Sequence, residues 1–355
     1  MKLLLVLFLL LSISSLCFAQ SMAELNPGFE DRLIDSFRGR NVKDNEYKDT
    51  SNPFVLFHFS DIHGDKVELQ RYVEFLGVYG KYFDDAICTG DLVPGAADQG
   101  FDFWGEVKGA EKILFVTGNH DFLRTMEGWE WWTNRLNKKE IWDQYFAKYI
   151  KNWGVTYKEG NTYYYKDYPR KKMRLIGLDC ALQNEENEEQ YKWFKDALTG
   201  ALENDYAVIV AYHYNPRNSV QIKCNFTDFD HYDSLGSYDD MRMYNKIVEV
   251  FKAGGGKFIC WLGGHTHWEQ FAYNKDFPGQ LYYSIDATNR EQCMMYSNIT
   301  RRDGHRSQDL ANAMVVDTST ETIKLIRIGA NEHSYLVQRN GIVINYKTFE
   351  VMSQF

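Results

Sequence analysis

The sequence predicts an α/β fold, because short apolar runs alternate along it with stretches that have helical periodicity. The first runs cover Phe54–Phe59, Ala86–Thr89 and Ile113–Val116, and a helix is expected over Lys66–Tyr79. Runs that lack polar alternation suit strands buried on both faces. The first half of the chain therefore indicates βαβ units.

The same alternation resumes further along. Strands are expected over 174–179, 207–212 and 258–262, and helices over 188–202 and 243–252. The remainder is rich in β-forming residues with turn signals between them. It predicts strands over 281–285, 313–316, 322–328 and 342–346.

Two segments depart from this pattern. Residues 20–50 are polar and predict an irregular N-terminal lead-in to a domain over 51–355. Residues 122–168 contain five Trp and predict a helical insertion beside the carboxyl edge of the sheet. Its aromatic side chains would form either a substrate wall or the core of the insertion, and the second is favoured because aromatics dominate core burial.

The first 19 residues have the pattern of a secretory signal peptide. Lys2 precedes an apolar run from Leu3 to Leu11, and small residues lead to Ala19, after which cleavage is expected. We therefore expect a secreted or periplasmic protein. The run is shorter than the roughly 20 residues that span a bilayer, and no later stretch reaches that length, so no transmembrane segment is expected in the mature chain.

The formal net charge is −9, and loss of Lys2 with the signal makes it −9 − 1 = −10. An acidic chain argues against non-specific binding of nucleic acid. The sequence leaves the oligomeric state open.

Five cysteines remain after the signal peptide. Cys88, Cys180 and Cys260 fall in or at the end of apolar runs, where buried thiols are expected. Cys224 and Cys293 fall in polar loops and could pair.

The residues that could carry chemistry follow the predicted strands. They form five clusters: Asp61-Ile62-His63, Gly90-Asp91, Gly118-Asn119-His120-Asp121, His213, and Gly264-His265-Thr266-His267. Ligand sites of open α/β sheets lie at the carboxyl ends of strands, so the five clusters are expected to meet.

The composition of the clusters indicates a metal centre. Asp61 and His63 are two residues apart, as are His265 and His267, so an extended backbone would point each pair to one side. Mixed imidazole and carboxylate ligands favour Mn, Zn, Fe, Co or Ni over Ca or Mg. Seven candidate ligands are too many for one tetrahedral ion and suit two ions with a bridging carboxylate.

The segments SDIHGD, CTGDL, VTGNHD, AYHYNP and GGHTH resemble the calcineurin-like metallophosphoesterase superfamily over roughly Phe54 to Trp268. This resemblance implies a four-layer αββα sandwich, in which helices flank two mixed β-sheets. It also implies that Asp61, His63 and His267 hold one metal, that Asn119, His213 and His265 hold the other, and that Asp91 bridges them. Pro94 departs from the pattern of the purple acid phosphatases, and Pro94 and Thr117 both depart from that of the protein Ser/Thr phosphatases.

The resemblance further implies hydrolysis of phosphomonoesters or phosphodiesters, with small-molecule substrates expected. A hydroxide that bridges the metals would attack phosphorus in line, and His120 would protonate the leaving oxygen as general acid. Asp121 would orient His120, or would only stabilise its loop. Arg124 and Arg217 would contact the substrate phosphate, or would form surface salt bridges.

Two alternative functions are considered. One is a nucleotide or phospholipid-headgroup phosphodiesterase. The other is a catalytically silent metal-binding or protein-binding module, which is disfavoured because every expected ligand and His120 are present.

Overall fold

A computed structural model describes residues 20–40, 47–49, 52–125, 133–182, 184–216, 219–224, 241–285, 287–289, 301, 303–329 and 340–355. The expected signal peptide, residues 1–19, lies outside these ranges. No helix in the described part of the chain combines the length and apolar character needed to cross a membrane.

Two seven-stranded mixed sheets form the centre of the molecule. The first has the order β16-β15-β14-β13-β3-β4-β5, and the second has the order β6-β7-β8-β10-β12-β11-β9. The first sheet consists of β3 Phe54–Phe59, β4 Asp85–Cys88, β5 Leu114–Phe115, β13 Leu310–Asp317, β14 Thr322–Gly329, β15 Gly341–Asn345 and β16 Val351–Gln354. The second consists of β6 Tyr164–Tyr168, β7 Met173–Gly177, β8 Ala207–Ala211, β9 Ser219–Gln221, β10 Lys257–Gly263, β11 Gln270–Asn274 and β12 Phe277–Ser284.

Each sheet has a parallel part. β3, β4 and β5 run parallel in the first sheet, and β7, β8, β10 and β12 run parallel in the second. The remaining strands pair antiparallel with their neighbours. The parallel strands are buried nearly throughout, which explains why their sequences are continuous apolar runs.

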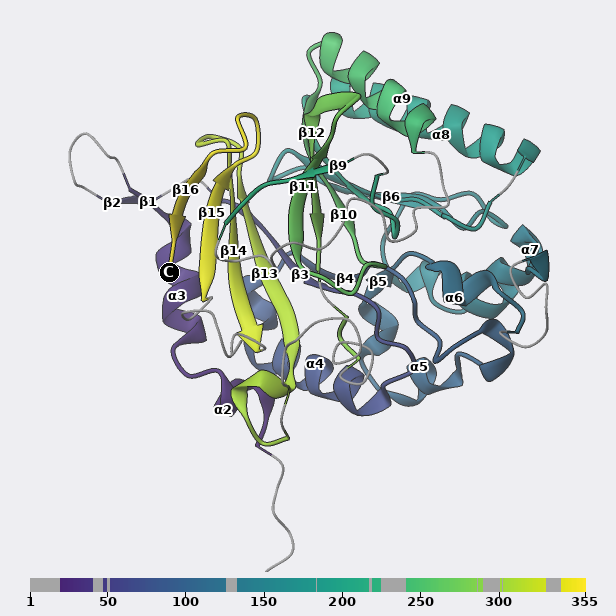
Figure 1. Cartoon of the computed structure of the whole chain (residues 1–355), viewed down its shortest axis with the longest axis horizontal. Coiled ribbons are helices and arrows are strands. Elements are labelled where there is room, and N and C mark those ends of the chain that lie inside the picture. The colour runs from purple at the N-terminus through teal and green to yellow at the C-terminus, as the bar shows by residue number, and fades with distance from the viewer. Residues whose placement is uncertain are drawn as a thin grey trace, which may run out of the picture.

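Helices cover the outer faces of the two sheets (Figure 1). α8 Asn184–Glu203 and α9 Arg242–Ala253 pack on the second sheet, while α3 Phe29–Phe37 packs on β13 and β14 of the first. The same view places α4 and α5 on the side away from α8 and α9. The other helices are α2 Met22–Leu25, α4 Lys66–Tyr79, α5 Asp102–Glu106, α6 Asn119–Phe122 and α7 Lys138–Ile141. The predicted αββα sandwich is confirmed.

Polar contacts join the facing sheets as well as apolar ones. The Tyr164 hydroxyl donates to the carbonyl of Phe115 over 3.0 Å, and the Thr89 hydroxyl donates to the carbonyl of Gly263 over 3.1 Å. Because both bonds are buried and directional, they fix how the second sheet sits on the first.

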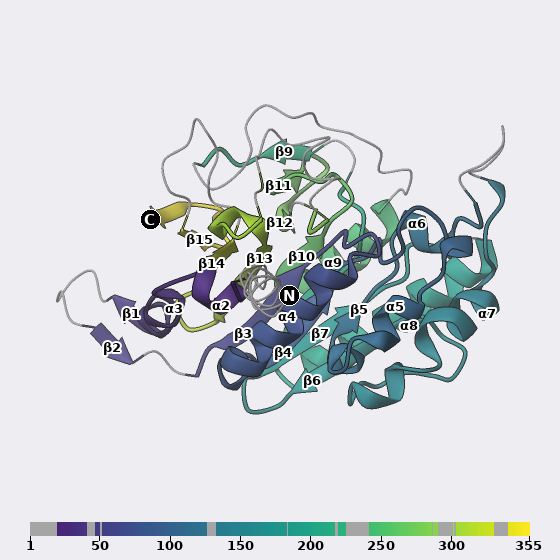
Figure 2. The same cartoon turned by 90° about the horizontal axis from the view of Figure 1, so that it is seen from below.

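The expectation that residues 20–50 are irregular is wrong for residues 22–37. This part forms α2 and α3, which lie beside the first sheet (Figure 2). Phe29 and Leu33 of α3 are fully buried. Two further residue ranges, Arg38–Arg40 and Tyr47–Asp49, pair as β1 and β2. Charged residues on the exposed face of α3 make the segment polar on average, so its apolar stripe is not evident from composition alone.

The aromatic-rich segment 122–168 is less helical than predicted. It contains α7 and a π-helical turn over Trp142–Phe146, and its end forms the edge strand β6. Trp153 is buried against Phe115 and Phe146, so its ring belongs to the core, as the favoured alternative requires. Trp129, Trp131 and Trp132 lie outside the described residues.

The thiols agree with the sequence where the structure describes them. Cys88 and Cys260 are buried free thiols, and Cys180 and Cys224 are buried as well. Cys293 lies outside the described residues, so its pairing with Cys224 stays untested.

Candidate metal centre

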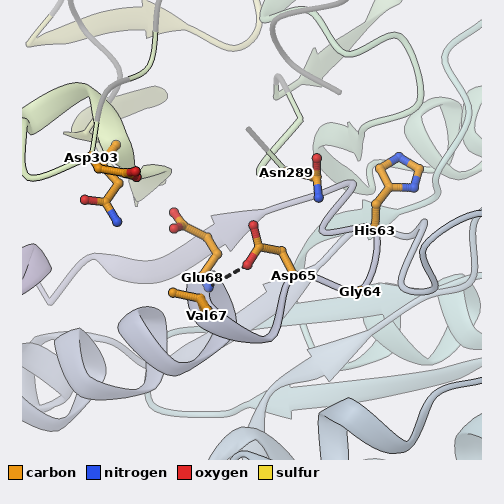
Figure 3. Close-up of a pocket in the computed structure, with 8 residues that line it drawn as sticks. His63, Gly64, Asp65, Val67, Glu68, Asn289 and Asp303 are labelled. Carbon is orange, nitrogen blue, oxygen red and sulfur yellow. Dashed lines mark hydrogen bonds between the residues drawn. The ribbon is translucent and has the colours of Figure 1, made fainter. Parts of the chain in front are cut away.

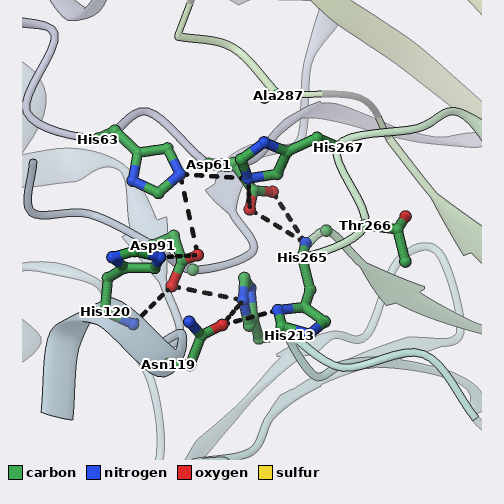
Figure 4. A network of polar contacts seen from close by, with 12 residues as sticks. Asp61, His63, Asp91, Asn119, His120, His213, His265, Thr266, His267 and Ala287 are labelled. Atoms are coloured by element: carbon green, nitrogen blue, oxygen red, sulfur yellow. Dashed lines mark hydrogen bonds and ion pairs between the residues drawn. The ribbon is translucent and has the colours of Figure 1, made fainter. Parts of the chain in front are cut away.

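The five clusters meet at the carboxyl ends of parallel strands from both sheets. Asp61 and His63 follow β3, Asp91 follows β4, Asn119 and His120 follow β5, His213 follows β8, and His265 and His267 follow β10. A cavity of about 350 Å³ lies beside His63 (Figure 3). Figure 4 shows the side chains converging on one another. The clusters were expected to meet at one edge of one sheet; they do meet, but at strand ends that belong to both sheets.

Two groups of donor atoms share Asp91. One group is Asp61, His63, Asp91 and His267, and the other is Asp91, His213 and His265, with the donor atoms of each group within 4.8 Å of one another. Asn119 completes the second group, because its Oδ1 lies 2.7 Å from His265 Nδ1 and 3.1 Å from His213 Nε2. The structure thus brings together the side chains that the resemblance assigns to each metal.

The spacing of the donor atoms fits a shared cation. The Nε2 atoms of His63 and His267 are 3.2 Å apart, and His267 Nε2 lies 3.3 Å from Asp61 Oδ1. Donor atoms at about 2.0–2.2 Å from one ion have this separation from one another. His63 Nδ1 is buried without a hydrogen-bond partner, so Nε2 is the ring atom that faces the group.

The backbone places these ligands in a way that the sequence did not indicate. Five candidate ligands have a positive φ of 44° to 67°: Asp61, His63, Asp91, His265 and His267. The expectation of extended pairs is therefore wrong, because each ligand sits on a sharp left-handed turn directly after its strand. Such conformations are uncommon for non-glycine residues and concentrate at functional sites.

Two glycines permit the close approach of the loops. A Cβ on Gly118 would lie 2.1 Å from Asp91 Oδ1, and one on Gly264 would lie 2.1 Å from Asp61 Oδ2. Both positions therefore require glycine if the carboxylates are to keep their places.

Hydrogen bonds to the backbone fix the imidazole rings. His213 Nδ1 lies 2.8 Å from the carbonyl of Thr89, which only accepts, so the proton is on Nδ1 and Nε2 faces Asp91 Oδ1 at 3.4 Å. His120 Nδ1 likewise bonds to the carbonyl of Gly95. Its Nε2 is 3.9 Å from Asp91 Oδ2, and its side chain is 21 % exposed, so a substrate can reach it. Sequence reasoning missed both carbonyls, because backbone acceptors leave no sequence signal.

The expected role of Asp121 in orienting His120 is wrong. The carboxylate of Asp121 is fully buried and accepts from the backbone N–H groups of Leu92, Val93 and Gly118 at 2.8, 3.1 and 2.7 Å. It thereby ties the loop after β4 to the loop after β5. The ring of His120 is oriented instead by its hydrogen bond to the carbonyl of Gly95. The alternative of a loop-stabilising carboxylate holds.

Arg124, one of the two arginines considered as phosphate contacts, forms a salt bridge within the protein. Arg124 Nη2 pairs with both carboxylate oxygens of Glu140 at 2.5 and 2.6 Å, and its Nε donates to the carbonyl of Arg135. Of the two roles considered for Arg124, the structure shows the salt bridge. Arg217 lies outside the described residues.

The electrostatics of the cluster favour cation binding. Burial opposes ionisation of Asp91, but His213 and His120 hold its pKa well below the ordinary value. Burial lowers the pKa of His63 to about 4, which leaves its imidazole neutral with a lone pair available. Burial also opposes protonation of His213, but Asp91 raises its pKa to about 9, so a cation would displace that proton.

Comparison with known proteins agrees with this geometry. A family model described as calcineurin-like phosphoesterase matches residues 54–269. No curated protein sequence matches the chain.

Similar solved structures include a dimetal phosphatase from Danio rerio, with 10 % identity and a TM-score of 0.48 over 83 % of this chain and 100 % of that one. They also include GAP50, the anchor in the inner membrane complex of Plasmodium, with 12 % identity and a TM-score of 0.42 over 86 % of this chain and 88 % of that one. The match to the family model spans well over half of the chain and contains every clustered residue. The chain therefore belongs to the calcineurin-like phosphoesterases and is a metal-dependent phosphoester hydrolase.

Proposed function

We propose that this protein uses two divalent ions, drawn from Mn, Zn, Fe, Co and Ni, to hydrolyse phosphomonoesters or phosphodiesters. The observation that carries the proposal is the position of Asp91 between two groups of nitrogen and oxygen donors. Asp61, His63 and His267 would hold one ion, and Asn119, His213 and His265 the other. Bound there, two cations lower the pKa of water and neutralise phosphate oxygens.

The chain's own groups explain how the reaction would be directed. The backbone bonds of His213 and His120 keep both rings in fixed orientations. Since His120 Nδ1 donates to Gly95, its Nε2 is the atom that can give a proton to a leaving oxygen. That nitrogen lies 3.9 Å from Asp91 Oδ2, on the side of the ring that faces the metal centre.

The test uses protein that lacks residues 1–19, stripped with a chelator and reloaded with Mn, Zn, Co or Ni. Release of nitrophenol from p-nitrophenyl phosphate or bis-p-nitrophenyl phosphate is measured beside the metal content. Metal-dependent release supports the proposal, and the ratio of the two rates distinguishes monoesterase from diesterase. Two bound ions without turnover of either ester would favour the silent module.

We also propose that the protein is secreted, on the basis of the apolar run and small residues before Ala19. Mass spectrometry of protein recovered outside the cells should find Gln20 as the first residue. Recovery of the chain only inside cells, with Met1 or Lys2 at its start, would contradict this.

A further inference from the structure

The cavity beside His63 has a polar, acidic lining. Its wall includes the carboxyl groups of Asp65, Glu68 and Asp303 and the side chains of Asn289 and Gln308. The described residues that line it include no Lys, Arg, Phe, Tyr or Trp. At about 350 Å³ the cavity has room for a small substituent. It adjoins the metal centre through His63, which belongs to both.

Glu68 is the residue that points to a ligand. It is only 5 % exposed, and its Oε1 is buried without a hydrogen-bond partner. Figure 3 shows its carboxylate directed between Asp65 and Asp303. A buried carboxylate oxygen without a partner is costly, so a donor from a bound molecule would satisfy it.

The neighbouring arginines do not supply that donor. Arg71 Nε is 4.0 Å from Glu68 Oε2 and bonds to Asp309 at 2.5 Å. Arg301 Nη2 is 3.7 Å from Glu68 Oε1, beyond hydrogen-bond length, and bonds to the carbonyl of Gln308 at 2.6 Å.

The formal charges of Arg71, Arg301, Glu68 and Asp309 cancel, because two guanidinium groups face two carboxylates. Asp65 and Asp303 add two further carboxyl groups to the lining of the cavity. Burial and Asp309 raise the pKa of Glu68 well above its ordinary value, an effect that a bound cation would offset.

We propose that this cavity binds a protonated primary amine carried by the phosphate ester, so that the enzyme prefers aminoalkyl phosphate esters. Carboxylates and amide oxygens match the three N–H donors of an ammonium group. A quaternary ammonium would instead be recognised by an aromatic cage, which the described lining does not provide. The inference rests on the proposed phosphoesterase function, since the amine is placed relative to the phosphate at the metals.

The test compares two esters of nearly equal shape, 2-aminoethyl phosphate and propyl phosphate. Each is used as a competitor against whichever nitrophenyl ester the metal-loaded enzyme hydrolyses, so a failure of the basal assay is seen separately. The aminoethyl ester should bind about tenfold more tightly, as expected for one charge-assisted hydrogen bond. Equal inhibition constants for the two esters would exclude a soluble aminoalkyl ester as the ligand, and together with equal release from the two kinds of vesicle described below they would overturn the inference.

Variants assign the preference to the cavity. Glu68→Gln should reduce the preference for 2-aminoethyl phosphate over propyl phosphate to about threefold or less, while hydrolysis of the nitrophenyl ester is retained. If that variant does not fold, Asp303→Asn or Asp65→Asn should reduce the preference instead, since Asn can still cap α4 at position 65. Glu74→Gln, on the exposed face of the same helix, is the control. A preference that survives all three cavity variants, or that Glu74→Gln also removes, would refute the assignment.

The amine has two possible sources, a soluble ester and a lipid headgroup. Vesicles of phosphatidylethanolamine, compared with vesicles of phosphatidylcholine, test the second source by release of the headgroup. Selectivity for the primary amine in either format supports the inference. Its absence in both contradicts it.

Discussion

Asp121→Asn distinguishes a residue that holds two loops together from one that acts through His120. The carboxylate accepts three buried backbone N–H groups, at 2.8 and 3.1 Å on Oδ1 and at 2.7 Å on Oδ2. An amide can keep its oxygen on the first two donors, but its NH₂ then faces the N–H of Gly118. One buried bond is lost at about 1–3 kcal/mol, and the other two lose their charge assistance.

The expected loss of unfolding free energy is about 2–4 kcal/mol, measured by urea unfolding followed by tryptophan fluorescence. Asp98→Asn, at an exposed position on the neighbouring loop, is the matched control and should stay within about 0.5 kcal/mol of the wild type. Because Asp91 and His120 sit on the two loops, the turnover of Asp121→Asn should fall by a similar factor for nitrophenyl and alkyl esters. If stability stayed at the level of the control and only the alkyl ester slowed, Asp121 would be acting through the general acid, and the reasoning would be refuted.

Four further outcomes follow from the geometry. His120→Ala should keep its metal but lose about 10²–10⁴ in rate, most of all on alkyl esters, in steady-state assays; an unchanged alkyl rate would exclude the acid role. His265→Ala should lose metal and activity together, as measured by elemental analysis beside the rate, and full metal occupancy would argue against its place as a ligand. Gly264→Ala, whose Cβ would lie 1.9 Å from Ser60 Oγ, should displace Asp61 and reduce metal content, whereas normal loading would show that the loop adapts. Trp153→Ala should lower the unfolding free energy by about 3–5 kcal/mol in urea titrations, and a smaller change would mean that neighbouring side chains move into the space left by the ring.

The sequence predicted most of the fold, for a physical reason. Strands buried on both faces are continuous apolar runs, and the predicted limits of Phe54–Phe59 and Lys66–Tyr79 match β3 and α4. The short edge strands β9 and β16 were missed, because strands with no fully buried residue carry mixed residues that lack a clear period. β11, which lies between β12 and β9, was missed as well. α3 was missed because its polar face dominates its composition.

The site could be predicted only as far as side chains reveal it. Residue type and position after a strand brought Asp91, His213 and the other clustered residues together. The partners of His120 and Asp121 could not be predicted, since they are the Gly95 carbonyl and three backbone N–H groups, and any sequence presents these. The partner of Arg124, whether a substrate or Glu140, likewise depends on how the loops pack.

The left-handed turns at the candidate ligands have a consequence for the history of such a protein. At each of the five positions, glycine would lower the conformational free energy of the backbone by roughly 1 kcal/mol. Stability and function therefore pull in opposite directions at the same five positions. A lineage that no longer needed turnover could therefore gain stability by exchanging these residues for glycine.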